Sequence, residues 1–318
     1  SHVTLRLAIL GTGRIAHDHA AAARSLDSVR LVAAIDVDAS AAESFAQTWD
    51  CEWWGTTLAE APEVDAVIVC SPTSLHRLHA LAAIERGCSV LVEKPFARSV
   101  EEAEEIIAAA ESKGVVVSSG QVLRFMPLFS WAREAIASGA LGRPVQAIER
   151  RLADRADNFP WWSELPAFLI SHWGSHSIDV LCDLLGERAV EVYCQADSVR
   201  SAFGVVDDVS MQLKFESGAR ATSVMSFSSR YVVHDLVLIG TEGTMTFDCF
   251  RSATLNGQTV IELPQDEMIA RGFEAQLRDF VGAIGGAPSL GSARSVLPAL
   301  AALAAAERSA LGAGVVRP

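Results

Sequence analysis

The stretch LRLAILGTGRIA at residues 5–16 decides the fold. Residues 7–10 form a continuous apolar run, which is typical of a parallel β-strand that helices cover on both faces. A Gly-x-Gly-x-x-Ala pattern follows at once. Gly11 permits a tight turn, Gly13 lets the backbone approach a pyrophosphate, and Ala16 is small enough for close packing of a helix on the strand. The stretch therefore predicts a strand, a turn and a helix that bind a dinucleotide.

The helix that begins in this turn directs free N–H groups and its positive dipole end at phosphates. Arg14 and Ile15 therefore join the two glycines as predicted cofactor-binding residues. A second apolar run, 29–35, ends at Asp36, and a carboxylate at that place accepts hydrogen bonds from the adenosine ribose. It would repel a 2′-phosphate, and residues 37–39 include no Arg or Lys to bind one, so we predict NAD rather than NADP. The alternative is an ordinary glycine turn followed by a surface aspartate.

A second motif, Glu93-Lys94-Pro95, follows the short apolar run 89–92. That run reads as another strand of the same sheet, so Lys94 should stand where the strand ends, on the side of the sheet where ligands bind. The two motifs together indicate nicotinamide-dependent chemistry more strongly than either does alone.

The first 120 or so residues alternate strand and helix patterns, which predicts βαβ units and a doubly wound parallel sheet. The expected strands are 5–10, 29–35, 66–70, 89–92 and 115–118, and the expected helices are 14–26, 39–49, 75–86 and 100–113. Ser99 and Glu102 form a capping-box pattern at the start of the last helix. Gly87 and Gly114 stand where helices should end.

After Gly120 short strand patterns dominate, with a few helices. The expected strands are 145–153, 190–199, 209–215, 220–227, 234–239 and 243–247, and the expected helices are 130–138, 171–185, 273–284 and 293–311, with a surface loop at 282–292. This pattern predicts a mostly antiparallel sheet with helices on one face. The predicted fold class is α/β: an N-terminal Rossmann domain at residues 1–122, then an α+β domain with a large, mostly antiparallel open sheet at residues 123–318.

Composition excludes several classes of function. The net charge is −13 and no basic cluster stands out, which argues against nucleic acid or an anionic membrane as the main partner. No apolar stretch is long and uninterrupted enough to cross a bilayer, because Pro298 and Glu307 limit the richest run, 296–306. The six scattered cysteines form no C-x-x-C pair, which favours free thiols in a reducing cytoplasm.

Several further segments carry a family resemblance. They are GTGRIAHDH at 11–19, CSPTSLH at 70–76, EKP at 93–95, GQVLRFMP at 120–127, GSHSID at 174–179 and FEAQLRDFVGAI at 273–284. In this order they resemble the Gfo/Idh/MocA family of nicotinamide-dependent oxidoreductases, over most of the chain. The resemblance implies a Rossmann domain followed by an α/β domain whose open sheet forms a homodimer or homotetramer interface. It also implies a sugar, a polyol or a related compound as substrate.

The resemblance also assigns roles to residues. His176 matches the family's catalytic base, and a histidine suits a proton acceptor whose pKa must lie near the working pH. Lys94 would hydrogen-bond the reacting oxygen and stabilise its developing negative charge. Glu93 would contact the cofactor near its nicotinamide ribose, and Pro95 would shape the turn. The remaining residues expected along the cofactor groove are Ser71, Pro72, Thr73 and His76.

One position departs from the family pattern. Family members carry Asp four residues before the catalytic histidine, whereas this chain has His172 there. Either His172 takes part in proton transfer or substrate binding, or the catalytic set is incomplete. His172 and His176 share a face if their segment is an α-helix, but no third ligand is evident, so no metal site is predicted.

Substrate contacts are expected from several segments. The loop 154–162 follows a predicted strand, and its polar and aromatic side chains suit hydroxyl groups and a sugar ring; the alternative is an interdomain loop with aromatic packing. Arg124 and Asp179 have both a substrate-binding and a structural interpretation, and His19 is interpreted as structural. The predicted substrate contacts are Arg124, Asp157, Trp162 and Asp179.

The leading hypothesis is an NAD-dependent dehydrogenase that acts on CH–OH groups of a sugar, polyol or related compound. Two alternatives remain open. One is glycoside cleavage assisted by transient use of bound NAD. The other is a regulator that keeps the fold and the cofactor but has lost turnover.

Overall fold

A computed structural model describes residues 4–154, 165, 167–200 and 204–318. It divides the chain into two compact units. The first is Ser1–Met126 with Ile269–Leu297, and the second is Pro127–Met268 with Pro298–Pro318. The first unit therefore includes a segment from far along the chain, which the sequence pattern did not indicate.

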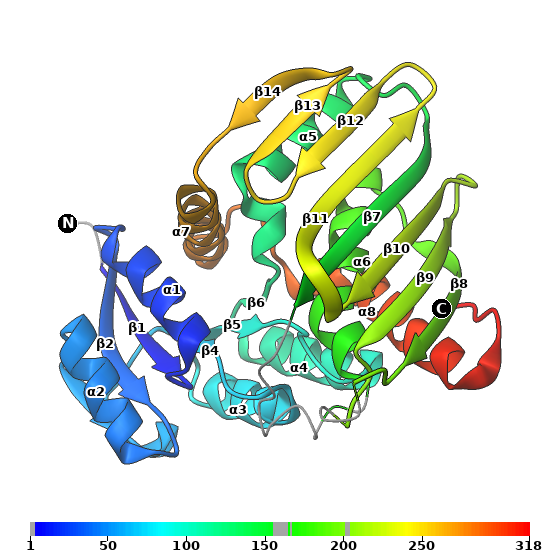
Figure 1. Ribbon diagram of the computed structural model, residues 1–318. Coiled ribbons are helices and arrows are strands. Elements are labelled where there is room, and N and C mark those ends of the chain that lie inside the picture. Colours follow the sequence, from blue (N-terminus) through cyan, green and yellow to red (C-terminus); the bar gives the residue numbers. More distant parts are fainter. Residues whose placement is uncertain (1–3, 155–164, 166, 201–203) are drawn as a thin grey trace. The chain divides into compact units, whose positions relative to one another are not determined.

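The first unit contains a six-stranded parallel sheet with the order β3-β2-β1-β4-β5-β6 (Figure 1). Its strands are β1 (Leu5–Leu10), β2 (Val29–Ile35), β3 (Trp53–Gly55), β4 (Ala66–Val69), β5 (Ser89–Glu93) and β6 (Val117–Gly120). Its connecting helices are α1 (Arg14–Arg24), α2 (Ala39–Trp49), α3 (Thr73–Glu85) and α4 (Val100–Lys113). This confirms the predicted Rossmann sheet. The strand order reverses between β1 and β4, and ligands bind at the carboxyl ends of the strands at such a switch point.

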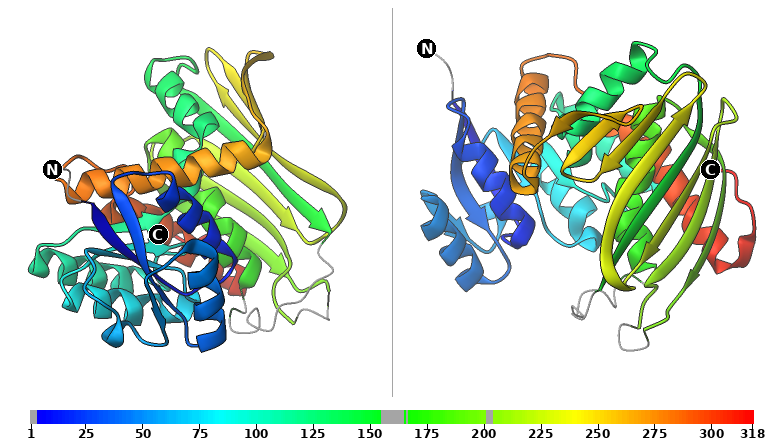
Figure 2. Two further views of the ribbon diagram at one scale, coloured as in Figure 1. Left: turned by 90° about the vertical axis from the view of Figure 1, so that its left-hand side faces the viewer. Right: turned by 45° about the horizontal axis from the view of Figure 1, so that its top comes forward.

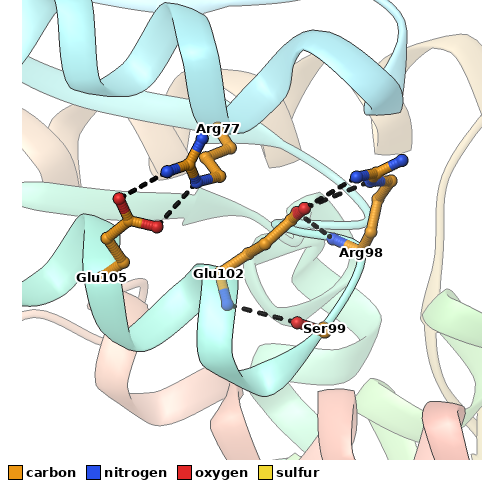
Figure 3. Close-up of polar contacts among 5 residues, drawn as sticks. All are labelled: Arg77, Arg98, Ser99, Glu102 and Glu105. Atoms are coloured by element: carbon orange, nitrogen blue, oxygen red, sulfur yellow. Dashed lines mark hydrogen bonds and ion pairs between the residues drawn. The ribbon is translucent and has the colours of Figure 1, made fainter.

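Helix ends in this unit follow the local sequence signals. Ser99 precedes α4, and its hydroxyl accepts a hydrogen bond from Glu102 N at 3.2 Å (Figure 3). The Glu102 carboxylate reaches back one residue further than a capping box requires, to Arg98 N at 3.1 Å, and also binds the Arg98 guanidinium. Gly87 and Gly114 have φ of 80° and 68°, the left-handed backbone expected after a helix.

The second unit contains an eight-stranded sheet with the order β14-β13-β12-β11-β7-β10-β9-β8. Its strands are β7 (Pro144–Asp154), β8 (Ala189–Asp197), β9 (Asp208–Phe215), β10 (Arg220–Ser226), β11 (Ser228–Gly240), β12 (Thr244–Asp248), β13 (Ser252–Leu255) and β14 (Gln258–Glu262). The pair β7–β10 is parallel, and the other neighbouring pairs are antiparallel. The mostly antiparallel sheet is therefore confirmed, and β13 and β14 extend it beyond the expected strands.

Helices cover one face of this sheet. They include α5 (Pro127–Ala137) and α6 (Ser175–Leu185) (Figure 2). The Phe129 ring of α5 stacks on Phe247 of β12, with ring centroids 5.5 Å apart. Along β9 the exposed and buried side chains alternate, as expected when one face of a sheet is packed and the other is open.

Two long helices complete the chain. They are α7 (Gln265–Ile284) and α8 (Ala293–Arg308), and α8 continues into a π-turn at Ser309–Ala313. The combined helix Ala293–Ala313 is long and apolar enough to cross a membrane by length and composition alone, and 44% of its most apolar window is buried. Core helices of soluble proteins pass the same test, so this helix is weak support for a membrane span.

Candidate active site

The Gly-rich turn of the first unit packs tightly against the end of β4. Gly11 has φ of 93°, and a Cβ added there would lie 2.6 Å from Cys70 C and from Ser71 N. Both its conformation and its neighbours therefore require glycine. Gly13 differs, because its φ is −70° and a Cβ would meet no atom within 4 Å. The space beside Gly13 is what a backbone approach to a pyrophosphate needs.

The start of α1 has the features of an anion site. Gly13 is its N-cap and makes no side-chain capping bond, and the first turn contains no acidic residue. Backbone N–H groups in the first turn of a helix lack intrahelical partners and bind phosphate groups. Together with the open space at Gly13, this arrangement fits the pyrophosphate of a dinucleotide.

Asp36 is fixed beside this turn, directly after β2. Its Oδ2 atom accepts hydrogen bonds from Thr12 N at 2.8 Å and from Thr12 Oγ1 at 2.9 Å, and its Oδ1 atom accepts one from Asp38 N at 3.0 Å. The carboxylate is therefore oriented before any ligand binds. Asp38 caps α2 through Ser40 N and Ala41 N. Two carboxylates and no cation in this short segment disfavour a 2′-phosphate.

The residues expected along the cofactor groove after β4 lie at the start of α3. Pro72 is the N-cap of this helix and Thr73 is its first residue. The ring of His76, which is buried, places Nε2 2.8 Å from Ser71 O and Nδ1 2.8 Å from Pro95 O. His76 therefore links the end of β4 to the turn after β5. Burial lowers the pKa of His76, although both carbonyl contacts raise it.

Glu93 and Lys94 stand at the end of β5, as expected. The Glu93 carboxylate is buried, and its Oε1 atom lies 2.7 Å from His19 Nε2 while its Oε2 atom accepts a hydrogen bond from Lys94 N at 3.0 Å. The peptide bond between Lys94 and Pro95 is cis. Burial alone would raise the pKa of Glu93, but the hydrogen bond and charge of His19 and the nearby Lys94 outweigh it, so its pKa lies below the usual range. Glu93 is therefore a charged carboxylate.

The two candidate histidines of the second unit lie in adjoining helical segments. His172 lies in a π-turn, Ile170–Gly174, and its ring stacks on Phe168 with centroids 4.9 Å apart. His176 lies in the first turn of α6, and both histidines are partly exposed. The sequence pattern predicted one continuous helix over 171–185. A π-turn inside such a helix is a frequent feature of functional sites, and it changes the rotation between two residues four apart.

A buried polar cluster lies next to α6 and was not predicted from the sequence. Glu149 of β7 accepts hydrogen bonds from Ser177 Oγ at 3.0 Å and from Ser223 Oγ at 2.6 Å, and His234 Nε2 lies 3.8 Å from it. Ser177 directly follows His176, so the cluster anchors that part of α6 to the sheet. The alternation of β7 gave a usable signal, because Glu149 occupies an inward position two residues after buried Ala147.

The predicted substrate contacts have diverse surroundings. Arg124 is 4% exposed, and its guanidinium donates to Leu290 O, Ser295 Oγ and Ser295 O, at 3.0, 2.7 and 3.2 Å. Asp179 is fully buried in α6. These positions favour their structural interpretations over direct contact with a substrate. Asp157 and Trp162 lie outside the described residues. Within the residues that the structure describes, no group of three His, Cys, Asp or Glu side chains could hold a metal ion.

Each unit contains a segment that matches a known family model. A family model described as "Oxidoreductase family, NAD-binding Rossmann fold" matches residues 5–121, and one described as "GFO/IDH/MocA C-terminal domain" matches residues 129–246. The chain is 27% identical to 4-carboxy-2-hydroxymuconate-6-semialdehyde dehydrogenase of Sphingobium sp. (strain NBRC 103272 / SYK-6), over 88% of this chain and 90% of that protein. It is 30% identical to scyllo-inositol 2-dehydrogenase (NAD(+)) of Bacillus subtilis (strain 168), over 78% of this chain and 75% of that protein.

The fold agrees with a solved relative. The crystal structure of GenD2 from gentamicin A biosynthesis, in complex with NAD, superposes with a TM-score of 0.89 at 25% identity and covers 100% of this chain and 98% of that one. The two family models extend over the Gly-rich turn, the Glu93-Lys94-Pro95 motif and the helix that carries His176. The chain is a member of the Gfo/Idh/MocA family of NAD-binding oxidoreductases.

Proposed function

We propose that the protein is an NAD-dependent dehydrogenase that oxidises a secondary hydroxyl group of a sugar, a polyol or a related hydroxy compound. The observation that carries the proposal is the position of Lys94. It follows β5, at the same edge of the parallel sheet as the Gly-rich turn after β1 and the end of β4. Its backbone is held there by a charged, buried carboxylate.

The chemistry assigns one task to each proposed catalytic residue. NAD, when bound, supplies a hydride acceptor. The Lys94 ammonium group donates a hydrogen bond to the substrate oxygen and stabilises the negative charge that develops there. His176 accepts the hydroxyl proton, because an imidazole combines a pKa near neutrality with an acceptor nitrogen.

His172 is proposed as a third member of the catalytic set. It occupies the position where relatives in the family pattern carry a carboxylate, and a neutral imidazole cannot supply that charge. An imidazole can instead exchange a proton or hydrogen-bond a substrate hydroxyl group. Phe168 supports one face of its ring and so fixes its orientation.

The cofactor contacts divide between the Gly-rich turn and the strand ends. Gly11, Gly13, Arg14 and Ile15 would hold the pyrophosphate, and Asp36 would accept hydrogen bonds from the adenosine ribose. Ser71, Pro72, Thr73, His76 and Glu93 would shape the rest of the groove. Asp157 and Trp162 remain proposed substrate contacts, whereas the burial of Arg124 and Asp179 favours structural roles for these two residues.

We also infer a homodimer or homotetramer and a reducing, cytoplasmic setting. The open face of the large sheet carries apolar side chains, such as Ile148, which is 39% exposed, and an interface would cover them. None of the six cysteines, all in the described part of the chain, forms a disulfide. A thiol without a disulfide suits a reducing compartment.

The test is NADH absorbance during incubation with NAD and a panel of inositols, sugars, sugar acids and hydroxylated semialdehydes. Lys94→Ala should abolish the signal. Lys113→Ala is the matched control, since Lys113 lies at the exposed end of α4 and pairs with Glu85. Released glycan without net NADH would instead indicate NAD-assisted cleavage. NAD binding with no turnover on any compound would indicate a non-catalytic regulator.

A further inference from the structure

A buried hydrogen bond connects the cofactor-binding helix to Glu93, the residue that precedes the proposed catalytic lysine. His19 lies in α1, the helix that begins in the Gly-rich turn, and its Nε2 atom is 2.7 Å from Glu93 Oε1. The side chains of His19 and Glu93 are 1% and 8% exposed. A charged carboxylate has no hydrogen to donate, so the Nε2–H group of His19 is the donor. The other carboxylate oxygen accepts the backbone N–H of Lys94.

The surroundings leave this carboxylate little freedom to turn. Gly120 of β6 packs against it so closely that an added Cβ would lie 2.8 Å from Glu93 Cα and 3.0 Å from Glu93 Oε1. On the other side of the pair, the Phe273 ring meets the His19 ring edge to face, with centroids 5.0 Å apart. Both rings and the carboxylate are therefore held by packing as well as by hydrogen bonds.

We propose that His19 is a positioning residue for Lys94. The imidazole of His19 fixes the Glu93 carboxylate, and the carboxylate fixes the backbone of Lys94 through its N–H group. The proposal rests on the proposed function of Lys94 and adds a residue from a different part of the chain to it. His19 touches neither substrate nor cofactor in this account, and it acts through Glu93 alone.

Without His19 the carboxylate would lose the partner that balances its burial. A buried charge without a partner is costly, so Glu93 would turn or take up a proton. Either change weakens the acceptor for Lys94 N. Displacement of a catalytic group by about 1 Å costs about 100-fold in rate, so a small shift of the Lys94 backbone is sufficient for a large effect.

The experiment compares three variants in the full-length protein. His19→Leu removes the donor and should lower kcat about 10-fold to 100-fold. His19→Gln should restore most of the rate, because its side-chain amide places an N–H donor near the position of Nε2. His17→Leu is the matched control, since His17 is exposed on the same helix and bonds Trp49. It should behave as the wild type.

Coupling between the two residues gives a second readout. If His19 acts through Glu93, adding His19→Leu to Glu93→Gln should lower kcat no further than Glu93→Gln does alone. Additive losses would overturn the proposal. So would a His19→Leu variant that loses NAD affinity and keeps kcat, because that result would place the effect in the cofactor-binding turn.

A third readout needs no substrate, so it separates this proposal from the proposed reaction. The chain contains three lysines, Lys94, Lys113 and Lys214. After reductive methylation with ¹³C-formaldehyde, each lysine gives its own NMR signal, and Lys94→Ala assigns one of them. His19→Leu should shift the Lys94 signal and its titration midpoint and leave the other two unchanged. An unchanged Lys94 signal would overturn the proposal even if Lys94 proved catalytic.

If His19→Leu does not fold, Gly120→Ala serves as the second variant. Its added methyl group would press on Glu93 while His19 stays in place. The same shift of the Lys94 signal is expected, together with the same loss of kcat. A folded Gly120→Ala variant with a wild-type Lys94 signal would contradict the proposal.

Discussion

Replacement of Gly11 by alanine should destabilise the protein more than the same change at Gly87. Both glycines have left-handed backbones, with φ of 93° and 80°. At Gly11 the new Cβ would lie 2.6 Å from the backbone of Cys70 and Ser71, whereas at Gly87 it would meet no atom within 4 Å. Gly87→Ala therefore measures the free-energy cost of a side chain on a left-handed backbone. Gly11→Ala measures that cost together with the cost of the steric clash.

The magnitudes follow from these two terms. An L-residue in the left-handed region costs about 1–2 kcal/mol, and an overpacked site costs about 1–3 kcal/mol more. The clash at Gly11 is with main-chain atoms, which cannot rotate away. We therefore expect a loss of about 2–5 kcal/mol for Gly11→Ala and about 1–2 kcal/mol for Gly87→Ala. The gain from a stiffer unfolded chain is common to both variants and cancels in their difference.

Urea unfolding followed by circular dichroism gives the free energy of unfolding of each variant. The m-value should stay at its wild-type level, so that a change in midpoint reports stability alone. Equal losses for the two variants would refute the close approach of the Gly-rich turn to the end of β4. That result would also remove the structural reason for glycine at the first position of the motif.

Other substitutions separate cofactor binding from stability and test the sign of two titrations. Gly13→Ala should keep the wild-type unfolding midpoint, because its Cβ meets no protein atom within 4 Å. The variant should nevertheless bind NAD about tenfold more weakly in a fluorescence titration. Wild-type affinity would exclude a backbone approach to the pyrophosphate. Glu93→Gln should be less stable than the wild type at neutral pH. The folded pKa of Glu93 lies below the unfolded one, so this difference in stability should vanish as the pH falls through the folded pKa. A difference independent of pH would count against a charged Glu93 carboxylate. Glu307→Gln should instead stabilise the protein at neutral pH, because burial raises the pKa of Glu307, although Ser171 donates a hydrogen bond to its carboxylate. The variant should be more stable than the wild type above the ordinary pKa of Glu307 and equal to it in acid, as unfolding curves across this range would show.

Four parallel strands of the first unit, β1, β2, β4 and β5, could be predicted to within one residue. Strands buried on both faces form continuous apolar runs, and glycine marks the turns between them, so the sequence signal is local. β3 was missed because three residues, Trp53–Gly55, are too few to show a pattern. β14 is the edge strand, and its mostly exposed side chains hide any alternation, whereas β13 has only four residues, Ser252–Leu255.

The start of α7 shows a similar limit. Its first turns contain several polar residues, so the apolar periodicity used for prediction began at 273, whereas the helix begins at Gln265. The helix ends at Ile284, as predicted. The turn after it is held by Asp279, which accepts hydrogen bonds from Ser289 Oγ, Leu290 N and Gly291 N.

The motif residues of the candidate site could be predicted, but the contacts behind them could not. Gly11, Asp36 and Lys94 belong to short patterns in which residue type and spacing indicate the chemistry. The pair of His19 and Glu93 joins residues 74 positions apart, and no local pattern links them. Such contacts depend on how strands and helices pack, which the sequence specifies only through the whole fold.

The most direct test of the central claim is the transfer of a labelled hydride. The protein should be incubated with NAD and polyols or sugars that carry deuterium at the carbinol carbon, and the NADH formed should be analysed by mass spectrometry. We predict deuterated NADH from at least one compound, with loss of the product in Lys94→Ala and in His176→Ala and its retention in Lys113→Ala. Deuterated NADH formed at wild-type rate by both Lys94→Ala and His176→Ala would contradict the account.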